Sequence, residues 1–247
     1  MARVVLTQPQ PRVESLAGAL SERGHDVACL SFTRVRPLEV HGLAARLASV
    51  DWVVAVSPAA LERLAALLGG AWPAGPGLAL IGPGSLRALK QTGMVVPPER
   101  LSHPVLPPFD ACALLRSGPL ANPAGMRVLI ARGEGGRDDW IDQLREAGAA
   151  IEVLALYERD PVHPDPHAVE RVQTWLAGRA RVYCLLTQTG TAARLSDLLT
   201  MDRLRAPDGP MVVLAIHQRI ADAASGAGFP QVRLIDPGEE AVIRAIE

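Results

Sequence analysis

The most constraining feature of this chain is that it repeats itself once. Residues 3–37 align with residues 127–161 without a gap, every position being shifted by 124. Each copy contains an apolar strand, a turn, an amphipathic helix closed by a glycine (Gly24 or Gly148) and a second apolar strand, which predicts a βαβ unit used twice. Because half of 247 residues is an ordinary domain size, the repeat predicts an internal duplication with two lobes and a cleft between them.

Apolar, β-branched segments alternate with helical segments along the chain. Strands that lead into helices are expected to begin near Val4, Trp52, Leu78, Val128, Val182 and Val212, with further strands near Val27, Val95, Ile151 and Val232. These ten strands would give five to each lobe. Continuously apolar strands are typical of parallel sheets buried on both faces, so we predict an α/β fold with a doubly wound parallel sheet in each lobe.

Two proline-bearing stretches, Thr33–Pro37 and 157–166, are the best linker candidates. They occupy equivalent places inside the two repeats, so the chain could cross between the lobes at both. The predicted boundaries are 1–35 with 163–247 for the first lobe, 39–157 for the second, and 34–40 and 157–163 for the linkers.

The composition is that of a globular protein, with 49% hydrophobic residues, 22 glycines and 21 prolines. No apolar run approaches the roughly 18 residues of a membrane span. The N-terminal Met-Ala-Arg leads into a strand rather than a signal peptide, so we expect a cytoplasmic protein without membrane contact. A formal net charge of −1 and an aromatic content of 4% argue against nucleic-acid binding.

Cysteine and histidine spacing gives no sign of a metal site. The three cysteines, Cys29, Cys112 and Cys184, lie in or near apolar segments without a Cys-x-x-Cys pair, so we expect buried, reduced thiols. His163 and His167 have the spacing of helical metal ligands, but the prolines between them prevent that helix. We therefore expect no metal ion.

Polar residues gather at the turns that follow the predicted strands. In open parallel sheets, ligands bind beyond the carboxyl ends of the strands, where helix N-termini present free N–H groups and a partial positive charge. The candidate binding residues at these turns are Thr7, Gln8, Ser57, Pro58, Gly82, Ser85, Arg132, Gly133, Thr187, Gln188 and Arg219. Many backbone donors with few charged side chains suit a large polyanion whose carboxylates are spread out.

Each turn also has a purely structural explanation. Ser57, Ser85 and Thr187 are good helix N-caps, and glycines permit tight turns whatever the ligand. The turn at Arg132 is neither a P-loop nor a Rossmann fingerprint, so nucleotide binding is unsupported. Arg132 could pair with a ligand carboxylate, or with Glu134 or Asp138, and the sequence leaves both open.

Tyr157 is one of only two tyrosines and ends a predicted strand where a linker begins. A phenol there could donate a proton or a hydrogen bond into the cleft. Without further information, an amphipathic side chain that packs at the hinge is the simpler explanation.

Several short segments follow one another in a specific order and spacing. They are Val5-Leu6-Thr7-Gln8-Pro9, Gly24-His25-Asp26-Val27, Ser57-Pro58, Ile81-Gly82-Pro83-Gly84-Ser85, residues 128–137 and Tyr157-Glu158-Arg159. In this order they resemble the uroporphyrinogen-III synthase family, the cyclising enzymes of tetrapyrrole biosynthesis, and the resemblance extends over nearly the whole chain. The resemblance implies two flavodoxin-like α/β lobes joined by a pair of linker strands, the first lobe built from both chain ends and the second from the middle.

The resemblance also implies an activity. Hydroxymethylbilane, a polyanionic linear tetrapyrrole, would lose its terminal hydroxyl, form a spiro intermediate at ring D and close to uroporphyrinogen III with ring D inverted. By this resemblance, Tyr157 is the candidate catalytic residue that assists departure of the hydroxyl, and Thr7, Ser57, Ser85 and Arg132 bind acetate and propionate groups. No metal or organic cofactor is implied. A monomer is expected, with a transient contact to the deaminase that makes the substrate.

The chain departs from the family pattern at three positions. Gln8 stands where arginine is common, Gln188 where serine is common, and His217 where glycine is expected. These changes weaken the carboxylate contacts expected from the first lobe, and Arg219 is a candidate to compensate. Two other functions compete with the enzyme: a catalytically degenerate regulatory or interaction module, and a two-lobed binding protein for an anionic metabolite.

Overall fold

The computed structural model describes residues 1–106, 109–135, 139–178, 180–199 and 206–247. It divides into two compact units, which are described separately below. Unit 1 combines Met1–Val35 with Asp160–Glu247, and unit 2 is Arg36–Arg159. No helix in the described residues is long and apolar enough to cross a membrane.

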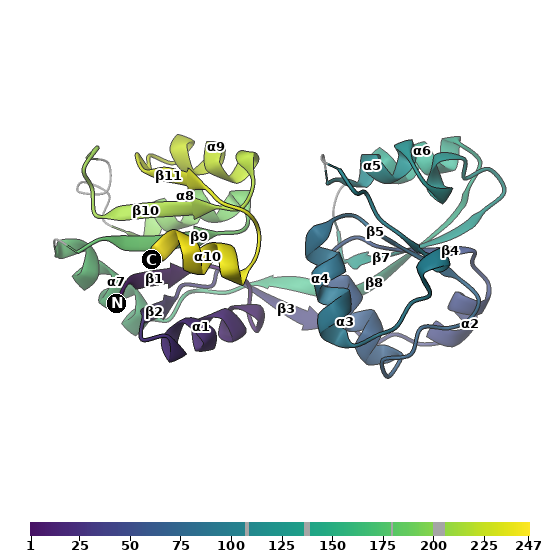
Figure 1. Cartoon of the computed structure of the whole chain (residues 1–247), viewed down its shortest axis with the longest axis horizontal. Helices are drawn as coiled ribbons and strands as arrows, with labels where there is room; N and C mark the ends of the chain where they lie inside the picture. The colour runs from purple at the N-terminus through teal and green to yellow at the C-terminus, as the bar shows by residue number, and fades with distance from the viewer. Residues whose placement is uncertain (107–108, 136–138, 179, 200–205) are drawn as a thin grey trace. The chain divides into compact units, whose positions relative to one another are not determined.

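Unit 1 is built on a five-stranded sheet with the order β11-β10-β9-β1-β2, in which every neighbouring pair is parallel (Figure 1). Its strands are β1 (Arg3–Leu6), β2 (Asp26–Cys29), β9 (Val182–Leu186), β10 (Met211–Ala215) and β11 (Val232–Leu234). Its helices are α1 (Arg12–Glu22), α7 (Pro166–Ala177), α8 (Thr189–Leu198), α9 (Gln218–Gly226) and α10 (Glu239–Ile246).

Both faces of this sheet are buried. Val4 and Leu6 of β1 pack in a core with α1 and α10, whereas Val5 packs in a second core with α7, α8 and α9. Successive side chains of a strand point to opposite faces, so a strand covered by helices on both sides is apolar at every position. This burial explains why β1 and β9 were recognisable from sequence.

Unit 2 contains a six-stranded sheet with the order β3-β8-β7-β4-β5-β6. Its strands are β3 (Thr33–Pro37), β4 (Trp52–Ala55), β5 (Gly77–Leu80), β6 (Leu101–Ser102), β7 (Arg127–Gly133) and β8 (Ala150–Pro161). Strands β3 and β8 contain the two points at which the chain passes from one unit to the other. The pairs from β8 through β7, β4 and β5 to β6 are parallel.

The helices of unit 2 are α2 (Leu43–Ala48), α3 (Pro58–Leu67), α4 (Pro83–Thr92), α5 (Ala111–Arg116) and α6 (Asp139–Glu146), with 3₁₀ turns at Pro98–Arg100 and Pro119–Ala121. Helices α5 and α6 lie on one side of the sheet, and α2, α3 and α4 lie on the other (Figure 1). Ile141 and Leu144 of α6 pack against Val54 and Ile130 of the sheet.

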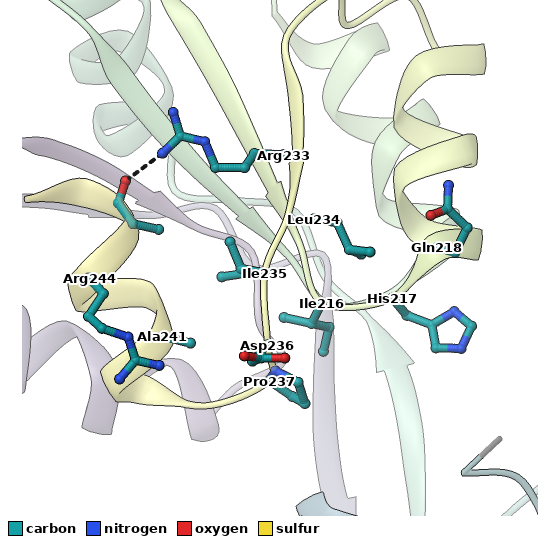
Figure 2. A pocket seen from close by; sticks show the side chains of 11 residues that line it. Ile216, His217, Gln218, Arg233, Leu234, Ile235, Asp236, Pro237, Ala241 and Arg244 are labelled. Carbon is teal, nitrogen blue, oxygen red and sulfur yellow. Dashed lines mark hydrogen bonds between the residues drawn. The ribbon is translucent and has the colours of Figure 1, made fainter. Parts of the chain in front are cut away.

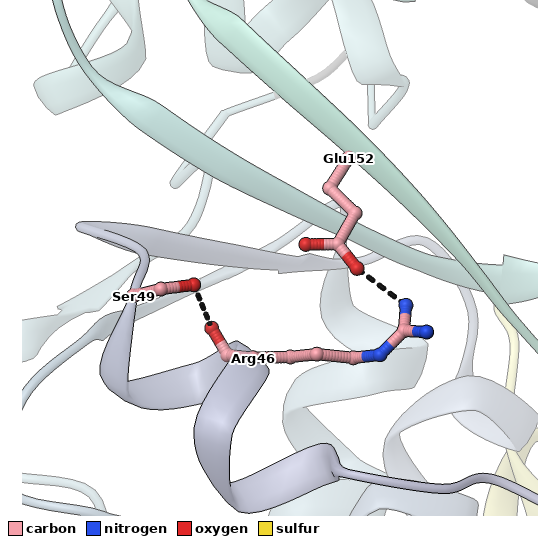
Figure 3. A network of polar contacts seen from close by, with 3 residues as sticks. All are labelled: Arg46, Ser49 and Glu152. Atoms are coloured by element: carbon pink, nitrogen blue, oxygen red, sulfur yellow. Dashed lines mark hydrogen bonds and ion pairs between the residues drawn. The ribbon is translucent and has the colours of Figure 1, made fainter.

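A polar contact ties α2 to β8. The guanidinium of Arg46 donates to the Glu152 carboxylate, and the hydroxyl of Ser49 donates to the Arg46 carbonyl at 2.8 Å (Figure 3). The two charged side chains are 42% and 39% exposed, so solvent screens their attraction. This ion pair therefore contributes much less to stability than the apolar core beneath α6.

The six strands expected to lead into helices are confirmed as β1, β4, β5, β7, β9 and β10. The strand expected near Val95 is wrong: Val95 forms only an isolated bridge with Ala71 and is 79% exposed, because Pro97 and Pro98 cannot donate to a ladder. Strand β6 was not expected, and β3 was expected only as a linker strand, on the family resemblance and not on its own residue pattern. β3 alternates arginine with other residues and is largely exposed, so it lacks the apolar run of a buried strand.

Leu144→Ala should lower the free energy of unfolding by about 2–5 kcal/mol, since it leaves a cavity in the core under α6. Glu152→Gln should lower it by at most about 1 kcal/mol, because the lost ion pair is half exposed. Urea denaturation followed by circular dichroism measures both changes. A larger loss for Glu152→Gln than for Leu144→Ala would contradict this ranking.

Candidate active site

A β-bulge next to Tyr157 positions its side chain. Gly133 pairs with Tyr157, whereas the preceding residues of β7 pair in the regular register, so Leu156 is the extra residue of β8. Two carbonyls at the bulge accept hydrogen bonds: Leu38 N donates to Leu156 O at 3.0 Å, and Glu134 N donates to Tyr157 O at 2.7 Å. The bulge fixes Tyr157 beside the carboxyl end of β7.

The ring of Tyr157 lies directly on Gly133. A Cβ atom at Gly133 would lie 2.5 Å from Cε2 of the ring, which no real contact permits, so glycine is required there. The phenol is only 2% exposed. Gly133 therefore leaves room for the Tyr157 ring to pack closely against the backbone. The sequence predicted Gly133 only as a ligand-binding residue and not this packing role.

Two side chains hold the Tyr157 hydroxyl. Its Oη lies 3.0 Å from Ser57 Oγ and 3.0 Å from Arg159 Nη2. The guanidinium carbon of Arg159 also stacks over the ring, 5.1 Å from its centroid. Because a guanidinium only donates, Oη must accept the bond from Arg159. Ser57, Gly133, Tyr157 and Arg159 are called the Tyr157 cluster below.

Ser57 has two roles in the structure. Its Oγ accepts the Ala60 N–H at 3.1 Å and thereby caps α3, and Pro58 occupies the first turn of that helix. The structural explanation of this turn is thus confirmed. The same oxygen also contacts Tyr157, so the cap and the phenol are held by one atom.

The Gly82 turn begins α4 without a side-chain cap. The N-cap is Gly82, and Ser85 is a buried residue inside the helix, so the N-cap expected at Ser85 is wrong. A Cβ at Gly84 would lie 3.6 Å from Cγ of Pro58, which places this turn beside the Ser57-Pro58 turn. Pro83 has no N–H and Ser85 N donates to Gly82 O at 3.1 Å, so the Gly84 N–H is the first-turn donor left for an anion.

Arg132 is 7% exposed and bonds to its own turn. Its Nε donates to Gly133 O at 3.3 Å, and its Nη2 donates to Gly135 O. Both of these bonds are with backbone carbonyls, an arrangement that the sequence did not suggest. Residues 136–138, which include the alternative partner Asp138, lie outside the described residues.

In unit 1, Thr7 and Gln8 follow β1 at the carboxyl edge of the sheet. Thr7 is buried, and its hydroxyl donates to Leu185 O of β9 at 2.7 Å. The backbone carbonyl of Gln8 accepts from Ser31 Oγ at 2.6 Å, but its side-chain Oε1 is buried without a partner among the described residues. A buried acceptor of this kind is normally satisfied by some donor.

The next turns along this edge begin α8 and α9. Gln188, and not Thr187, is the N-cap of α8, so the cap expected at Thr187 is wrong, and the Gln188 side chain makes no cap bond. His217 caps α9 by accepting the Arg219 N–H on Nδ1 at 3.1 Å. The Arg219 guanidinium is exposed and has no hydrogen-bond partner among the described residues.

A cavity of about 620 Å³ lies beyond the carboxyl ends of β10 and β11, against α10 (Figure 2). His217, Gln218, Arg233, Asp236 and Arg244 contribute its polar lining. Arg233 donates to the carbonyl of Ala245 at 3.1 Å. Only the His217-Gln218 turn of this lining was selected from the sequence.

All three cysteines are free thiols. Cys184 is buried, and burial raises the pKa of its thiol; partial burial, followed by the nearby Glu14, raises that of Cys29. Cys29 and Cys112 are only partly buried, so the expectation of three buried thiols is wrong for these two. Among the described residues, no group of three His, Cys, Asp or Glu side chains could hold a metal ion.

The structure thus gathers the predicted residues into separate groups. In unit 2, Ser57, Gly133 and Tyr157 are in contact, with Pro58 and the Gly82 turn adjoining them. In unit 1, Thr7 is bonded across β1 and β9. Arg159 was not among the predicted site residues, although its place two positions after Tyr157 on a strand puts both side chains on one face.

Comparison with known proteins identifies relatives of the whole chain. A family model described as "Uroporphyrinogen-III synthase HemD" matches residues 14–237. The uroporphyrinogen-III synthase of Salmonella typhimurium is 28% identical over 257 residues, which cover 99% of each chain. That of Escherichia coli is 28% identical over 135 residues, 54% of each chain.

Two solved structures share the fold. A uroporphyrinogen-III synthetase from Helicobacter pylori aligns with a TM-score of 0.58 and 12% identity, covering 99% of this chain and 98% of that one. A mutant uroporphyrinogen III synthase from Thermus thermophilus aligns with a TM-score of 0.56 and 17% identity, covering 99% and 97%. Since the family model spans nearly all of the sequence, the chain belongs to the uroporphyrinogen-III synthase family.

Proposed function

We propose that this protein converts hydroxymethylbilane into uroporphyrinogen III, with loss of water and inversion of ring D. The observation that carries the proposal is the family match across residues 14–237. The Tyr157 cluster supports it, because a phenol fixed beside the carboxyl end of a parallel strand lies where α/β proteins bind ligands. Tyr157 is the proposed acid that helps the terminal hydroxyl to leave as water.

Control of the product is the harder part of this reaction. The linear substrate closes without an enzyme to the uninverted isomer, so the protein must hold a conformation that favours the spiro route. Positioning can contribute about 7–11 kcal/mol to a barrier, whereas one general acid contributes roughly 10²–10⁴ in rate. The carboxylate-binding turns should therefore matter more than any single proton donor.

The proposed carboxylate sites are helix N-termini and the side chains beside them. The α4 start at Gly82 and the α8 start at Gln188 carry no side-chain cap, so the Gly84 N–H of α4 and the Thr189 and Gly190 N–H groups of α8 are the proposed anion donors. Thr7, Gln8, Ser57, Pro58, Ser85, Arg132, Gly133 and Thr187 remain predicted members of the binding surface. At α9 the His217 side chain already accepts the Arg219 N–H, so the start of this helix has one donor fewer for a substrate carboxylate.

The two units are also proposed to be flavodoxin-like copies of one ancestral lobe. The register Arg3↔Asp26 of β1 and β2 recurs as Arg127↔Ala150 in β7 and β8, again shifted by 124. Order β2-β1-β9-β10-β11 follows the flavodoxin pattern, and β8-β7-β4-β5-β6 follows it with β7 and β8 in the places of β1 and β2. The boundaries 1–35 with 163–247 and 39–157 stay predictions, as do the linkers.

Several further expectations stay predictions. They are a cytoplasmic location, a monomer, a transient contact with the upstream deaminase, and activity without metal or organic cofactor. Sedimentation of the purified protein would test the monomer, and activity after exhaustive chelation would test the metal.

The deciding experiment supplies freshly made hydroxymethylbilane to the purified protein without added cofactor. After oxidation, the ratio of type III to type I uroporphyrin is compared with a protein-free control. Predominantly type III product is expected. A ratio equal to the control would favour the degenerate module or the anion-binding protein instead.

Tyr157→Phe should lower turnover by about 10²-fold, because it removes the proposed acid but keeps the ring on Gly133. Tyr183→Phe, which changes the only other tyrosine, is the matched control and should keep full activity. Initial rates and circular dichroism of both variants provide the comparison. Unchanged turnover in Tyr157→Phe would reduce this residue to a packing role.

Gln188→Asp should stabilise the protein yet raise the KM. The new carboxylate would cap α8, worth about 0.5–2 kcal/mol, and it would occupy and repel the site of a substrate carboxylate. Gln188→Asn, a neutral cap of similar size, should raise the KM less. Equal KM values for both variants and the parent protein would show that the start of α8 does not bind a substrate carboxylate.

Arg219→Ala should raise the KM without lowering stability. A cation in the first turn of a helix is unfavourable to the helix dipole, so Arg219 is better explained by an anionic ligand than by stability. Steady-state kinetics and thermal denaturation measure the two effects. A lower melting temperature with an unchanged KM would show that Arg219 contributes to stability and not to substrate binding.

A further inference from the structure

The hydroxyl of Tyr157 is held by a charged group that has no assigned role. Arg159 Nη2 donates to Tyr157 Oη at 3.0 Å, and the same guanidinium stacks on the ring with its carbon 5.1 Å from the centroid. One side chain thus contacts both the oxygen and the π face of the phenol. The hydrogen bond restrains the hydroxyl, and the stacked guanidinium restrains the ring.

The direction of these hydrogen bonds follows from the donor inventory. A guanidinium has no acceptor, so Oη accepts from Arg159 and keeps its own proton for another partner. Ser57 Oγ, 3.0 Å away, already accepts the Ala60 N–H. The phenolic oxygen therefore faces a positive charge on one side and a hydroxyl on the other.

We propose that Arg159 is a positioning residue, which fixes the Tyr157 phenol and stabilises the oxygen when it gives up its proton. This proposal rests on the proposed synthase function. In the step, the proton of Tyr157 Oη passes to the terminal hydroxyl of the substrate, the carbon–oxygen bond breaks with both electrons leaving on oxygen, and water departs. The negative charge left on Oη lies against the Arg159 guanidinium, and the proton released on ring closure restores the phenol.

The local backbone supports this assignment. The bulge at Leu156 sets the register in which Tyr157 pairs with Gly133, and Arg159 lies two residues further along the same strand. Gly133 also lies against the ring, since a Cβ there would lie 2.5 Å from Cε2. The ring thus contacts both a glycine and a guanidinium, and 2% of the residue is exposed.

Kinetics provide the first test. Arg159→Gln should lower kcat by about 10-fold to 100-fold with little change in KM, the range expected for one lost charge-assisted hydrogen bond. Arg159→Lys keeps the charge and should recover part of the loss. Arg145→Gln, an arginine paired with Asp142 on α6, is the matched control and should keep full activity. A raised KM with unchanged kcat would instead mean a substrate contact and overturn the proposal.

A double variant tests whether Arg159 acts through Tyr157. Once the hydroxyl is gone, the guanidinium has no oxygen to hold, so Tyr157→Phe/Arg159→Gln should be no slower than Tyr157→Phe alone. Losses that multiply would show that Arg159 acts independently of Tyr157, and the assignment would be wrong.

Nuclear magnetic resonance tests the contact without any activity. In a Tyr183→Phe background Tyr157 is the only tyrosine, so ¹³Cζ-tyrosine labelling gives one resonance. That resonance should move in Arg159→Gln and move less in Arg159→Lys, while Arg145→Gln leaves it in place. An unmoved resonance overturns the proposal. A moved resonance in a protein that makes no type III product would refute the proposed function but uphold the Arg159 contact.

Discussion

Parallel pairing is the constraint on which the rest of this structure depends. All described strand pairs with an assigned register are parallel, so each neighbouring pair needs a crossover connection, and helices cover both faces of each sheet. Parallel strands also bring their carboxyl ends to one edge. The polar turns after β4 and β7 in one unit, and after β1, β9 and β10 in the other, follow from that single arrangement.

The buried parts of the fold were predictable from the sequence, because burial on both faces leaves a continuous apolar run. The exposed parts have no such pattern: β3, expected only as a linker strand from the family resemblance, alternates arginine with other residues, and β6 has only two residues. Val95 shows the reverse error: its apolar segment makes one bridge to Ala71, but Pro97 and Pro98 follow and cannot donate to a ladder, so no strand forms. An apolar segment of the sequence indicates that its residues are buried. It indicates a paired strand only where the strand is also buried.

The candidate site was predictable in its residues but less so in their roles. Proximity to a strand end selected Ser57, Gly133 and Tyr157, and the structure brings these three into contact. Of the three expected N-caps, only Ser57 caps its helix. The caps expected at Ser85 and Thr187 are wrong, because those helices have Gly82 and Gln188 at the N-cap position. The contact of Gly133 with Tyr157 depends on a bulge, and a one-residue change of register leaves no mark in the sequence.

The way the chain passes between its units also determines the order in which they can form during synthesis. Unit 2 is one continuous segment, Arg36–Arg159, and all its strands are available once that segment has emerged. Unit 1 is different, because β1 pairs with β9, Arg3 lying opposite Val182. At roughly 5–20 residues per second, β1 and β2 wait on the order of ten seconds for that partner. During that interval the apolar faces of the first βαβ segment have no sheet to complete them, while the inserted unit between them can already be folded.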